Sequence, residues 1–377
     1  MFREIFQSNQ KLKNFDRFTV RLNQALSLRS FQIGAHRRQE SASRVYYTIS
    51  DELSKIAIER LNSIIKSFYK VRQSDRSLIC NQIKNILEGH KSISVIKIDL
   101  KSFYVNVDTF LILGKIKSDR LFCPYTFKLL ECAISPKYNT HTKGLPEGIC
   151  LSATLSELYM REIDRKMSKI HSVSYYARFV DDIIIMGHKS SEEIFREAKD
   201  VLAPMASINP TKIYISPSAD SCDFSYLGYR FRKNKAAVSV LISELKIKKI
   251  KSRLILSLIK FQQDQNLGDL FDRIKYLTGN HTLKNQKREF PIKSGIYYTY
   301  PLLTKKEAIK QLEKLDSFLR NIIYAKHGRF GRILCNLDRG QRDELTKFKF
   351  SAGHKNRIMC KLPETKINNI TKIWHHA

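Results

Sequence analysis

The hydrophobic pattern predicts two strand-like stretches, each interrupted by aspartate. Residues 175–187 read YYARFVDDIIIMG, and the aromatic and β-branched residues on both sides of Asp181–Asp182 are typical of strands. Because Asp is common at turns and an unpaired buried carboxylate is costly, the simplest prediction is a hairpin with both aspartates at its turn. Taken alone, this pattern fits a solvated turn as well as a functional site.

A second strand carries one more carboxylate. Residues 94–107 read SVIKIDLKSFYVNV, with Asp99 at an otherwise apolar position. A strand ending in a polar turn would explain it, but carboxylates brought together repel one another unless a cation neutralises them. Oxygen ligands of this kind suit Mg²⁺, and a pair of Mg²⁺ ions serves in-line nucleotidyl transfer. Two such carboxylate sites in one chain, Asp99 and Asp181–Asp182, therefore suggest a paired Mg²⁺ site, with a polar turn as the alternative.

A glycine-rich segment lies between the two strands. Residues 142–160 read TKGLPEGICLSATLSELYM. Gly144, Pro146 and Gly148 predict a turn where the backbone can approach a nucleotide or template base closely. Leucines at helical spacing follow, which predicts a core helix. The motif is weak in isolation, because many loops have a similar composition.

A basic amphipathic segment begins the last third of the chain. Residues 244–261 read ELKIKKIKSRLILSLIKF, with apolar residues at helical intervals. Lys246, Lys249 and Arg253 are spaced by three and four residues and so share one helix face. We expect this face to contact a nucleic-acid backbone while the apolar face packs on the protein. A basic amphipathic helix could equally lie on a membrane surface.

The amino-acid composition limits the classes of molecule that the protein is expected to bind. The 377 residues are 42% hydrophobic with a net charge of +31, which predicts a globular protein of two or three subdomains that attracts polyanions, nucleic acid first. No apolar run reaches the roughly 18 residues of a membrane-spanning helix. Seven cysteines without a C-x-x-C pair predict a reducing compartment. An organelle presequence in residues 1–45 is the alternative, although Glu4 and Asp16 interrupt it.

The order of these motifs resembles the palm of reverse transcriptases. The matching segments are DLKSFY at 99–104, GLPEG at 144–148 and YARFVDD at 176–182. Three flanking segments also resemble the family: basic fingers at 69–87, an Asn/Lys motif at 208–215 and a primer-gripping hairpin at 224–231. The resemblance implies an α+β right-hand polymerase with fingers, a palm of antiparallel sheet plus helices, and a helical thumb.

This resemblance also implies a domain layout and an activity. We expect a basic N-terminal extension over 1–45, fingers and palm over 46–235, and a helical thumb with a basic C-terminal region over 236–377. The implied reaction is RNA-templated DNA synthesis, by attack of a 3′-hydroxyl on a dNTP. The resemblance implies that Asp99, Asp181 and Asp182 are catalytic and bind two Mg²⁺ ions. The rivals are an RNA-making polymerase with the same palm and a catalytically silent RNA-binding scaffold. Tyr104 argues against the first and the three aspartates against the second.

Nucleotide-binding roles follow from the same resemblance. Tyr104 matches the family's steric gate against the ribose 2′-hydroxyl, and a core aromatic is its alternative interpretation. Glu147 stands where a glutamine is common, which leaves its contact with the sugar open. Lys212 is expected beside the leaving pyrophosphate unless it is simply a solvated lysine. The expected triphosphate-binding residues, of which at least one is expected to be only a surface charge, are Lys70, Arg72 and Arg76.

The wording of several motifs is similar to one branch, the bacterial antiphage reverse transcriptases of the abortive-infection and defence-associated lineage. KSGIYYTYP at 293–301 suggests the smaller polymerase of a two-reverse-transcriptase system. This branch implies a cognate noncoding RNA as template, a DNA product and a bacterial cytoplasmic location without membrane attachment. It also suggests a second reverse transcriptase subunit or a homo-oligomer as partner.

Overall fold

The computed structural model describes residues 31–34, 36–41, 44–135, 144–283 and 292–374. The chain forms two compact units. The first unit contains residues 1–82 and 90–222, and the second contains residues 83–89 and 223–377. The expected boundary between residues 235 and 236 separates functional regions rather than compact units, and it remains a prediction.

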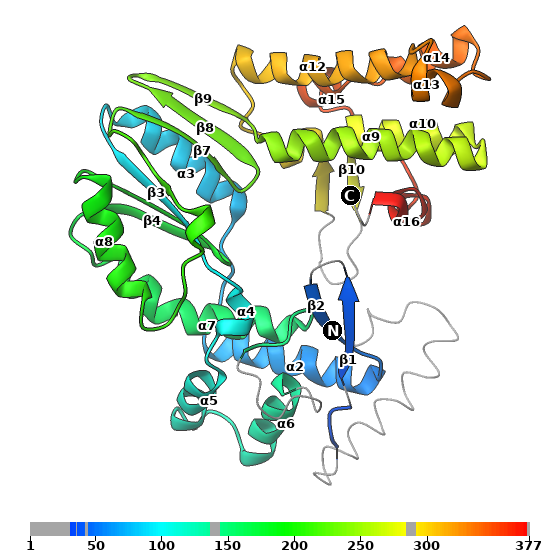
Figure 1. The fold of residues 1–377 in the computed structure, drawn as a ribbon. Helices are drawn as coiled ribbons and strands as arrows, with labels where there is room; N and C mark the ends of the chain where they lie inside the picture. Colours follow the sequence, from blue (N-terminus) through cyan, green and yellow to red (C-terminus); the bar gives the residue numbers. More distant parts are fainter. Residues whose placement is uncertain (1–30, 35, 42–43, 136–143, 284–291, 375–377) are drawn as a thin grey trace. The chain divides into compact units, whose positions relative to one another are not determined.

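The first unit is built on a four-stranded antiparallel sheet (Figure 1). Its strands are ordered β4-β5-β3-β6, with β3 at Ser94–Asp99, β4 at Val173–Phe179, β5 at Asp182–Gly187 and β6 at Tyr214–Ile215. The isoleucines of the central strands β3 and β5 are fully buried. Side chains of successive strand residues point to opposite faces, so both faces of this sheet must be covered.

Helices and a two-stranded hairpin complete the first unit. Helix α7 follows the glycine-rich segment, and its residues Leu151, Leu155 and Met160 are completely buried, which confirms the predicted core helix. The other elements of the first unit are β1 His36–Ser41, β2 Arg44–Ile49, α2 Glu52–Phe68, α4 Phe103–Asn106, α5 Thr109–Ser118, α6 Pro124–Ile134, α8 Ser191–Leu202 and η2 Pro210–Lys212, while α7 itself spans Cys150–Met167. Helix α3, Arg76–Gly89, belongs partly to each unit.

The second unit begins with a three-stranded sheet, β7-β8-β9. The segment expected to be a hairpin forms β7 and β8. Leu227 and Gly228 link these strands with φ angles of 47° and 86°, as two-residue hairpin turns of the primed type require. The strands are β7 Ser221–Tyr226, β8 Tyr229–Asn234 and β9 Ala237–Ile242. Tyr226, Tyr229 and Phe231 fill the sheet's core.

The rest of the second unit is mainly helical, as expected. Its elements are α9 Glu244–Asp264, α10 Leu267–Thr278, β10 Asn280–Leu283, β11 Ile292–Gly295, α11 Ile296–Thr299, α12 Lys306–Ile323, α13 Gly328–Ile333, α14 Arg339–Lys347, α15 Phe350–Lys355, α16 Glu364–Thr371 and η3 Lys372–Trp374. The apolar face of α9 starts later than the sequence suggested: Leu245 is 76% exposed, whereas Leu254 and Leu258 are buried. No helix in the described ranges has the length and apolar character that crossing a bilayer requires.

Candidate active site

The hairpin predicted around the aspartate pair is present. Strands β4 and β5 pair so that Phe179 faces Asp182, which leaves only Val180 and Asp181 in the turn. Val180 has a φ of 60°, a left-handed conformation that is unfavourable for a β-branched residue by about 1–2 kcal/mol. A strained residue therefore precedes Asp181, as is common where a side chain must be presented for function.

The third aspartate lies opposite this turn. Asp99 ends β3 and is the register partner of Asp182 on β5. The backbone N–H of Leu100 donates to the carbonyl of Asp181 at 3.1 Å, which joins the end of β3 to the turn itself. The structure thus brings Asp99, Asp181 and Asp182 to the same end of the sheet, although they are about 80 residues apart in the chain.

The carboxylates at this end of the sheet repel one another, and the pKa of Asp182 reflects its burial and that repulsion. The pKa of Asp182 is raised above its ordinary value, chiefly by burial. Lys97 opposes the rise, and the negative charges of Asp181 and Asp99 add to it. Like charges near a half-buried carboxylate favour a bound cation, because a cation relieves both the repulsion and the cost of burial.

Lysines supply the positive charge in this conformation. Lys212 Nζ lies 3.2 and 3.1 Å from the two carboxylate oxygens of Asp99, and Asn209 Nδ2 donates to the same carboxylate at 3.2 Å. Lys97 Nζ lies 3.9 Å from Asp182. Across the described residues, no three acidic, His or Cys side chains are already gathered around one metal position. The donor set fits a divalent cation in its chemistry, and such an ion would compete with Lys212 for Asp99.

The glycine-rich segment closely approaches the protein's own backbone, and the predicted approach to a nucleotide or template base stays a prediction. Gly144 has a φ of 111°, and a Cβ there would lie 2.4 Å from the Val105 carbonyl oxygen. Gly148 has a φ of 94°, and its Cβ would lie 2.6 Å from the Tyr47 carbonyl oxygen. Any larger residue would therefore push the loop away from the segments that hold Val105 and Tyr47.

Two backbone hydrogen bonds fix the same loop. Leu145 N–H donates to the Tyr104 carbonyl, and Tyr47 N–H donates to the Glu147 carbonyl, both at 2.7 Å. Glu147 is thereby attached to strand β2, and the Tyr104 backbone is attached to the loop. Two residues with predicted nucleotide contacts are thus held by one short segment.

The Tyr104 side chain lies close to the aspartates. Burial raises the pKa of Tyr104, a hydrogen bond with the Ser156 hydroxyl lowers it, and the charge of Asp181 raises it further. The ring is half-buried, packs against the core and lies 5.4 Å from the Phe103 ring. This position is compatible with both earlier interpretations, a steric gate beside the metal ligands and a core aromatic.

The predicted triphosphate-binding cations lie around the end of α2 and the start of α3. Lys70 and Arg72 are exposed, and Arg76 is half-buried at the first residue of α3. Helix α2 runs alongside α7: Asn62 bonds Thr154, and the Tyr69 carbonyl accepts from Arg161. The role of these three cations at the triphosphate stays a prediction.

The sequence analysis missed the β1–β2 hairpin as an element of the site. Its strand β2 contacts the Glu147–Gly148 backbone through Tyr47. Strand β1 carries Arg37 and Arg38, both exposed, with Arg38 paired to Glu40. The strand-like wording RVYYTI at 44–49 was the available signal, but it lies at the edge of a segment that was assigned to a basic extension.

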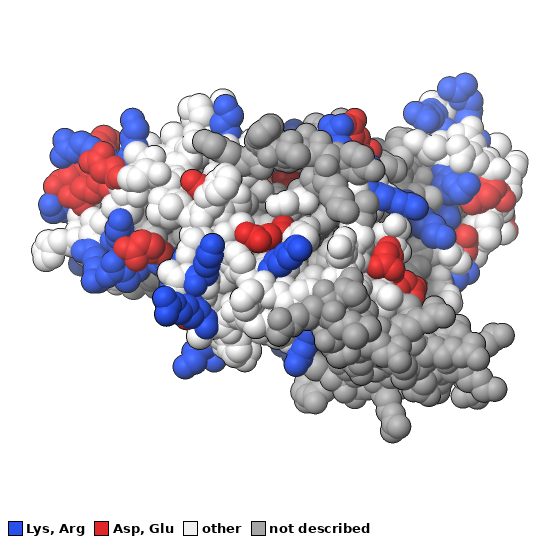
Figure 2. Space-filling model, turned by 90° about the horizontal axis from the view of Figure 1, so that it is seen from below, with Lys and Arg blue, Asp and Glu red and all other residues white. Residues whose placement is uncertain are grey.

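The cations predicted to contact nucleic acid share the first half of α9. Lys246 is exposed and Lys249 is half-exposed. Arg253 is turned partly toward the protein: its guanidinium carbon lies 5.8 Å from the centre of the Trp374 ring, and its carbonyl accepts from Trp374 Nε1 at 3.0 Å. Figure 2 shows that Lys and Arg occur as several groups separated by acidic side chains on the face displayed.

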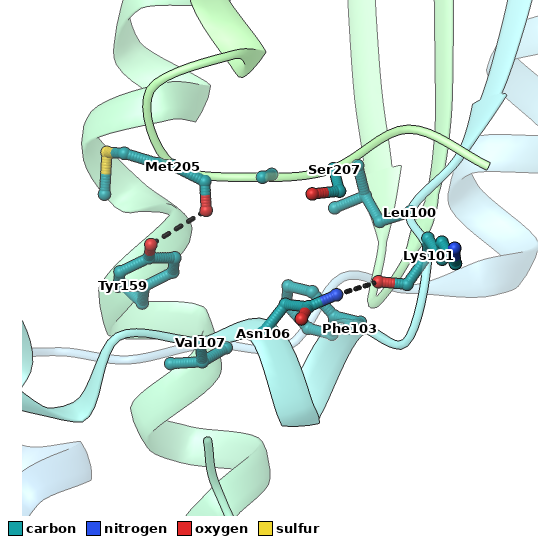
Figure 3. Close-up of a pocket in the computed structure, with 9 residues that line it drawn as sticks. Leu100, Lys101, Phe103, Asn106, Val107, Tyr159, Met205 and Ser207 are labelled. Carbon is teal, nitrogen blue, oxygen red and sulfur yellow. Dashed lines mark hydrogen bonds between the residues drawn. The ribbon is translucent and has the colours of Figure 1, made fainter. Parts of the chain in front are cut away.

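A small cavity lies behind the loop that follows Asp99 (Figure 3). Its volume is about 10 Å³, which is room for one water molecule and excludes a nucleotide. Two hydrogen bonds brace its walls, from the Tyr159 hydroxyl to the Met205 carbonyl at 2.8 Å and from Asn106 Nδ2 to the Lys101 carbonyl at 2.7 Å. The cavity is therefore a packing feature that supports the end of β3.

Comparison with solved structures gives three telomerase chains. Apo telomerase from Candida tropicalis truncated from the C-terminal domain is 12% identical, covers 55% of this chain and 54% of its own, and has a TM-score of 0.40. Telomerase from Candida albicans in complex with a TWJ fragment of telomeric RNA is 10% identical over 97% of this chain and 68% of its own, with a TM-score of 0.43. Apo telomerase from Candida tropicalis is 14% identical over 91% and 66%, with a TM-score of 0.41. The chain thus spans about half the length of the first of these, and at such TM-scores we base no argument on them.

Comparison with protein families gives the assignment. No curated protein matches the chain. Residues 38–231, just over half of the chain, match the family described as "Reverse transcriptase (RNA-dependent DNA polymerase)". The matched range contains all three aspartates, the glycine-rich loop and the β1–β2 hairpin except for its first residues. The chain, an α+β right-hand polymerase, therefore belongs to the reverse transcriptase (RNA-dependent DNA polymerase) family.

Proposed function

We propose that the protein is an RNA-directed DNA polymerase that adds dNTPs to a 3′-hydroxyl at the end of the sheet bearing Asp99, Asp181 and Asp182. The observation that carries the proposal is the register of β3 and β5, which places Asp99 opposite Asp182 beside the Asp181 turn. Three carboxylates in an apolar sheet destabilise the fold unless they have a cation to bind.

The protein's own residues have distinct roles in this proposal. Asp99 and Asp181 hold two Mg²⁺ ions, and Asp182 adjusts the charge behind them or serves as an occasional ligand. Bound Mg²⁺ supplies the positive charge that favours ionisation of the attacking hydroxyl and neutralises the departing pyrophosphate. Lys212, whose ammonium contacts Asp99, would be released by a cation bound at Asp99 and would then be free to contact the pyrophosphate.

Substrate selection falls to the elements held by the glycine-rich loop. Tyr104 excludes the ribose 2′-hydroxyl, and Glu147, whose backbone is bonded to Tyr47 of β2, contacts the nucleotide. Lys70, Arg72 and Arg76 are the first candidates to bind the triphosphate of the incoming nucleotide. Arg37 and Arg38 on the β1–β2 hairpin are the alternative phosphate ligands.

The biological role we propose is antiphage defence in a bacterium. Its support is the wording of YARFVDD, SATLSELYM and KSGIYYTYP, which is similar to the defence-associated lineage. In this role the template is a cognate noncoding RNA, the product is DNA, and the partner is a second reverse transcriptase subunit or a second copy of this chain. The reducing cytoplasm suits seven cysteines without a C-x-x-C pair.

Primer extension separates this function from its rivals. We expect purified protein with Mg²⁺ to extend a DNA or RNA primer on an RNA template with dNTPs and poorly with rNTPs. A polymerase that makes RNA would show the reverse preference, and a silent scaffold would bind the template without extending it. Sequencing the nucleic acid that copurifies with the protein would then identify the template.

Replacing Lys246, Lys249 and Arg253 together by Gln should weaken template–primer binding. Each lost phosphate contact lowers the salt slope of binding by roughly 0.7–0.9, so the slope should fall by about two to three. Single-turnover incorporation at saturating duplex and low salt should change little, because these residues lie outside the carboxylate site. Filter binding across a salt series measures the slope.

The matched control for this experiment replaces three exposed lysines of α12, namely Lys306, Lys310 and Lys314. Because Arg253 also packs on Trp374, the double variant Lys246→Gln/Lys249→Gln separates lost phosphate contacts from lost packing. A wild-type slope in the triple variant would mean that α9 does not follow the nucleic-acid backbone. A membrane-binding or partner-binding role for α9 would then be favoured.

A further inference from the structure

Arg178 contacts the strained turn that presents Asp181. It belongs to β4, is only 5% exposed, and donates from Nη1 to the carbonyl oxygen of Val180 at 2.9 Å. The carbonyl of one residue and the Cα of the next lie in one rigid peptide plane. A hydrogen bond to the Val180 carbonyl therefore fixes the plane from which the Asp181 side chain starts.

The same guanidinium is anchored on α7. It donates to both oxygens of Glu157, at 3.1 and 2.7 Å, and to both oxygens of Asp164, at 2.9 and 2.8 Å. Together with the bond to Val180 these are five hydrogen bonds, which matches the five N–H donors of an arginine. Lysine has three donors and no planar fork, so it cannot make this arrangement.

Helix α7 also acts on Tyr104. Burial raises the pKa of Tyr104, Ser156 lowers it, and the negative charge of Glu157 adds to the rise. Glu157 thus bonds Arg178 behind the Asp181 turn and acts electrostatically on Tyr104. The Asp164 end of the anchor is held further by the Tyr176 hydroxyl, which donates to it at 2.6 Å.

We propose that Arg178, anchored by Glu157 and Asp164, is a positioning residue that holds the Val180–Asp181 peptide so that the Asp181 carboxylate stays directed at a divalent cation shared with Asp99. This inference rests on the proposed function of the three aspartates. Arg178 would thus act on the metal site only through its hydrogen bond to the Val180 carbonyl, and it would touch neither metal nor substrate. The φ of Val180 is strained, so without the hydrogen bond from Arg178 the turn would relax away from that conformation.

The test is Mn²⁺ binding to the full-length protein in the absence of nucleic acid, measured from the signal of free Mn²⁺ in electron paramagnetic resonance. We expect Arg178→Gln to weaken Mn²⁺ affinity by roughly 10-fold or more, the usual cost of removing a partner that orients a metal ligand. Arg178→Lys keeps the positive charge but cannot bond the Val180 carbonyl and both carboxylates, so it should also weaken binding. If Arg178→Gln does not fold, Arg178→Lys decides the question.

The matched control is Arg273→Gln. Arg273 is a buried arginine, 3% exposed, on α10 of the other unit, within 3.5 Å of Asp269 and 3.9 Å of Asp264. Its loss should lower the melting temperature without changing Mn²⁺ affinity. Wild-type affinity in the Arg178 variants, or an equal loss of affinity in Arg273→Gln, would overturn the positioning role.

Failure of the proposed function would look different. If wild-type protein binds no Mn²⁺, or binds it as well after Asp99→Asn and Asp181→Asn, then the assignment of the metal site is wrong, and so is the positioning role of Arg178. If those two variants lose Mn²⁺ and the Arg178 variants keep it, the aspartates form the site and only the positioning role is wrong.

Discussion

Asp181→Ala is expected to abolish nucleotide incorporation while the protein stays folded and bound to RNA. Asp181 stands in the two-residue turn beside Asp99 and Asp182, and a metal site supplies several kcal/mol of charge stabilisation. Its loss therefore corresponds to a decrease in kcat of at least about 10³-fold. Single-nucleotide primer extension measures the decrease, and circular dichroism together with RNA binding checks the fold.

The same variant should not be less stable at neutral pH. The pKa of Asp182 is raised first by burial and in part by the charge of Asp181. A carboxyl group with a raised pKa destabilises the folded state above that pKa and not below its unfolded value, near pH 4. Removing the neighbouring charge should therefore leave stability unchanged or slightly higher at pH 7, with no gain at about pH 3. Thermal unfolding at the two pH values measures this difference.

The control for this prediction is Asp200→Ala, which removes an exposed carboxylate from α8 in the same unit. It should incorporate nucleotides at the wild-type rate. Full incorporation by Asp181→Ala, with RNA binding intact, would rule out the carboxylates as the catalytic centre.

Tyr104→Ala is expected to change the choice of nucleotide more than the rate of synthesis. If the ring blocks the 2′-hydroxyl, its removal should raise kcat/KM for rNTPs relative to dNTPs by roughly 10- to 10³-fold, since one excluded group is worth a few kcal/mol. Competition between dNTPs and rNTPs in primer extension measures the ratio. Some loss of stability should accompany the change, because the half-buried ring also packs on the core.

Tyr104→Phe is the matched control. It keeps the ring and removes only the hydroxyl, so nucleotide selection should be close to that of the wild type. An unchanged ratio in Tyr104→Ala, alongside a stability loss, would assign Tyr104 to the core and not to the nucleotide.

Several features of the fold were accessible from the sequence because their signals are local. Aspartates within β-branched runs predicted the hairpin at Val180–Asp181, since Asp is unfavourable inside a strand. Leucines at helical spacing predicted α7, and the glycines of the preceding loop predicted a close backbone approach. In these cases the residues that give the pattern are the residues that form the contact.

Other features depend on contacts between distant residues. Arg178 belongs to a motif that the sequence analysis quoted, but its anchors lie 21 and 14 residues earlier, on α7. Nothing in the local pattern distinguishes it from a solvated arginine. The Leu245 position shows the same limit, because sequence spacing does not say which side of a helix the rest of the chain covers. Leu245 proved 76% exposed for this reason.

The β1–β2 hairpin was missed for a different reason. Residues 36–41 are almost entirely polar, so they lack the apolar alternation by which half-buried strands are recognised. Their pairing with β2 is made by the backbone, and β2 reaches the glycine-rich loop through the Tyr47 and Glu147 backbones. Backbone hydrogen bonds do not depend on side-chain identity, so these pairings are difficult to predict from the sequence.

The most direct test of the central claim is to sequence the product that purified protein makes from a defined RNA template and primer with Mg²⁺ and all four dNTPs. Synthesis at the Asp99, Asp181 and Asp182 site predicts DNA complementary to the template, absent when Mg²⁺ is chelated and absent in Asp181→Ala. A product made of ribonucleotides, a product unrelated to the template, or undiminished synthesis by Asp181→Ala would contradict it.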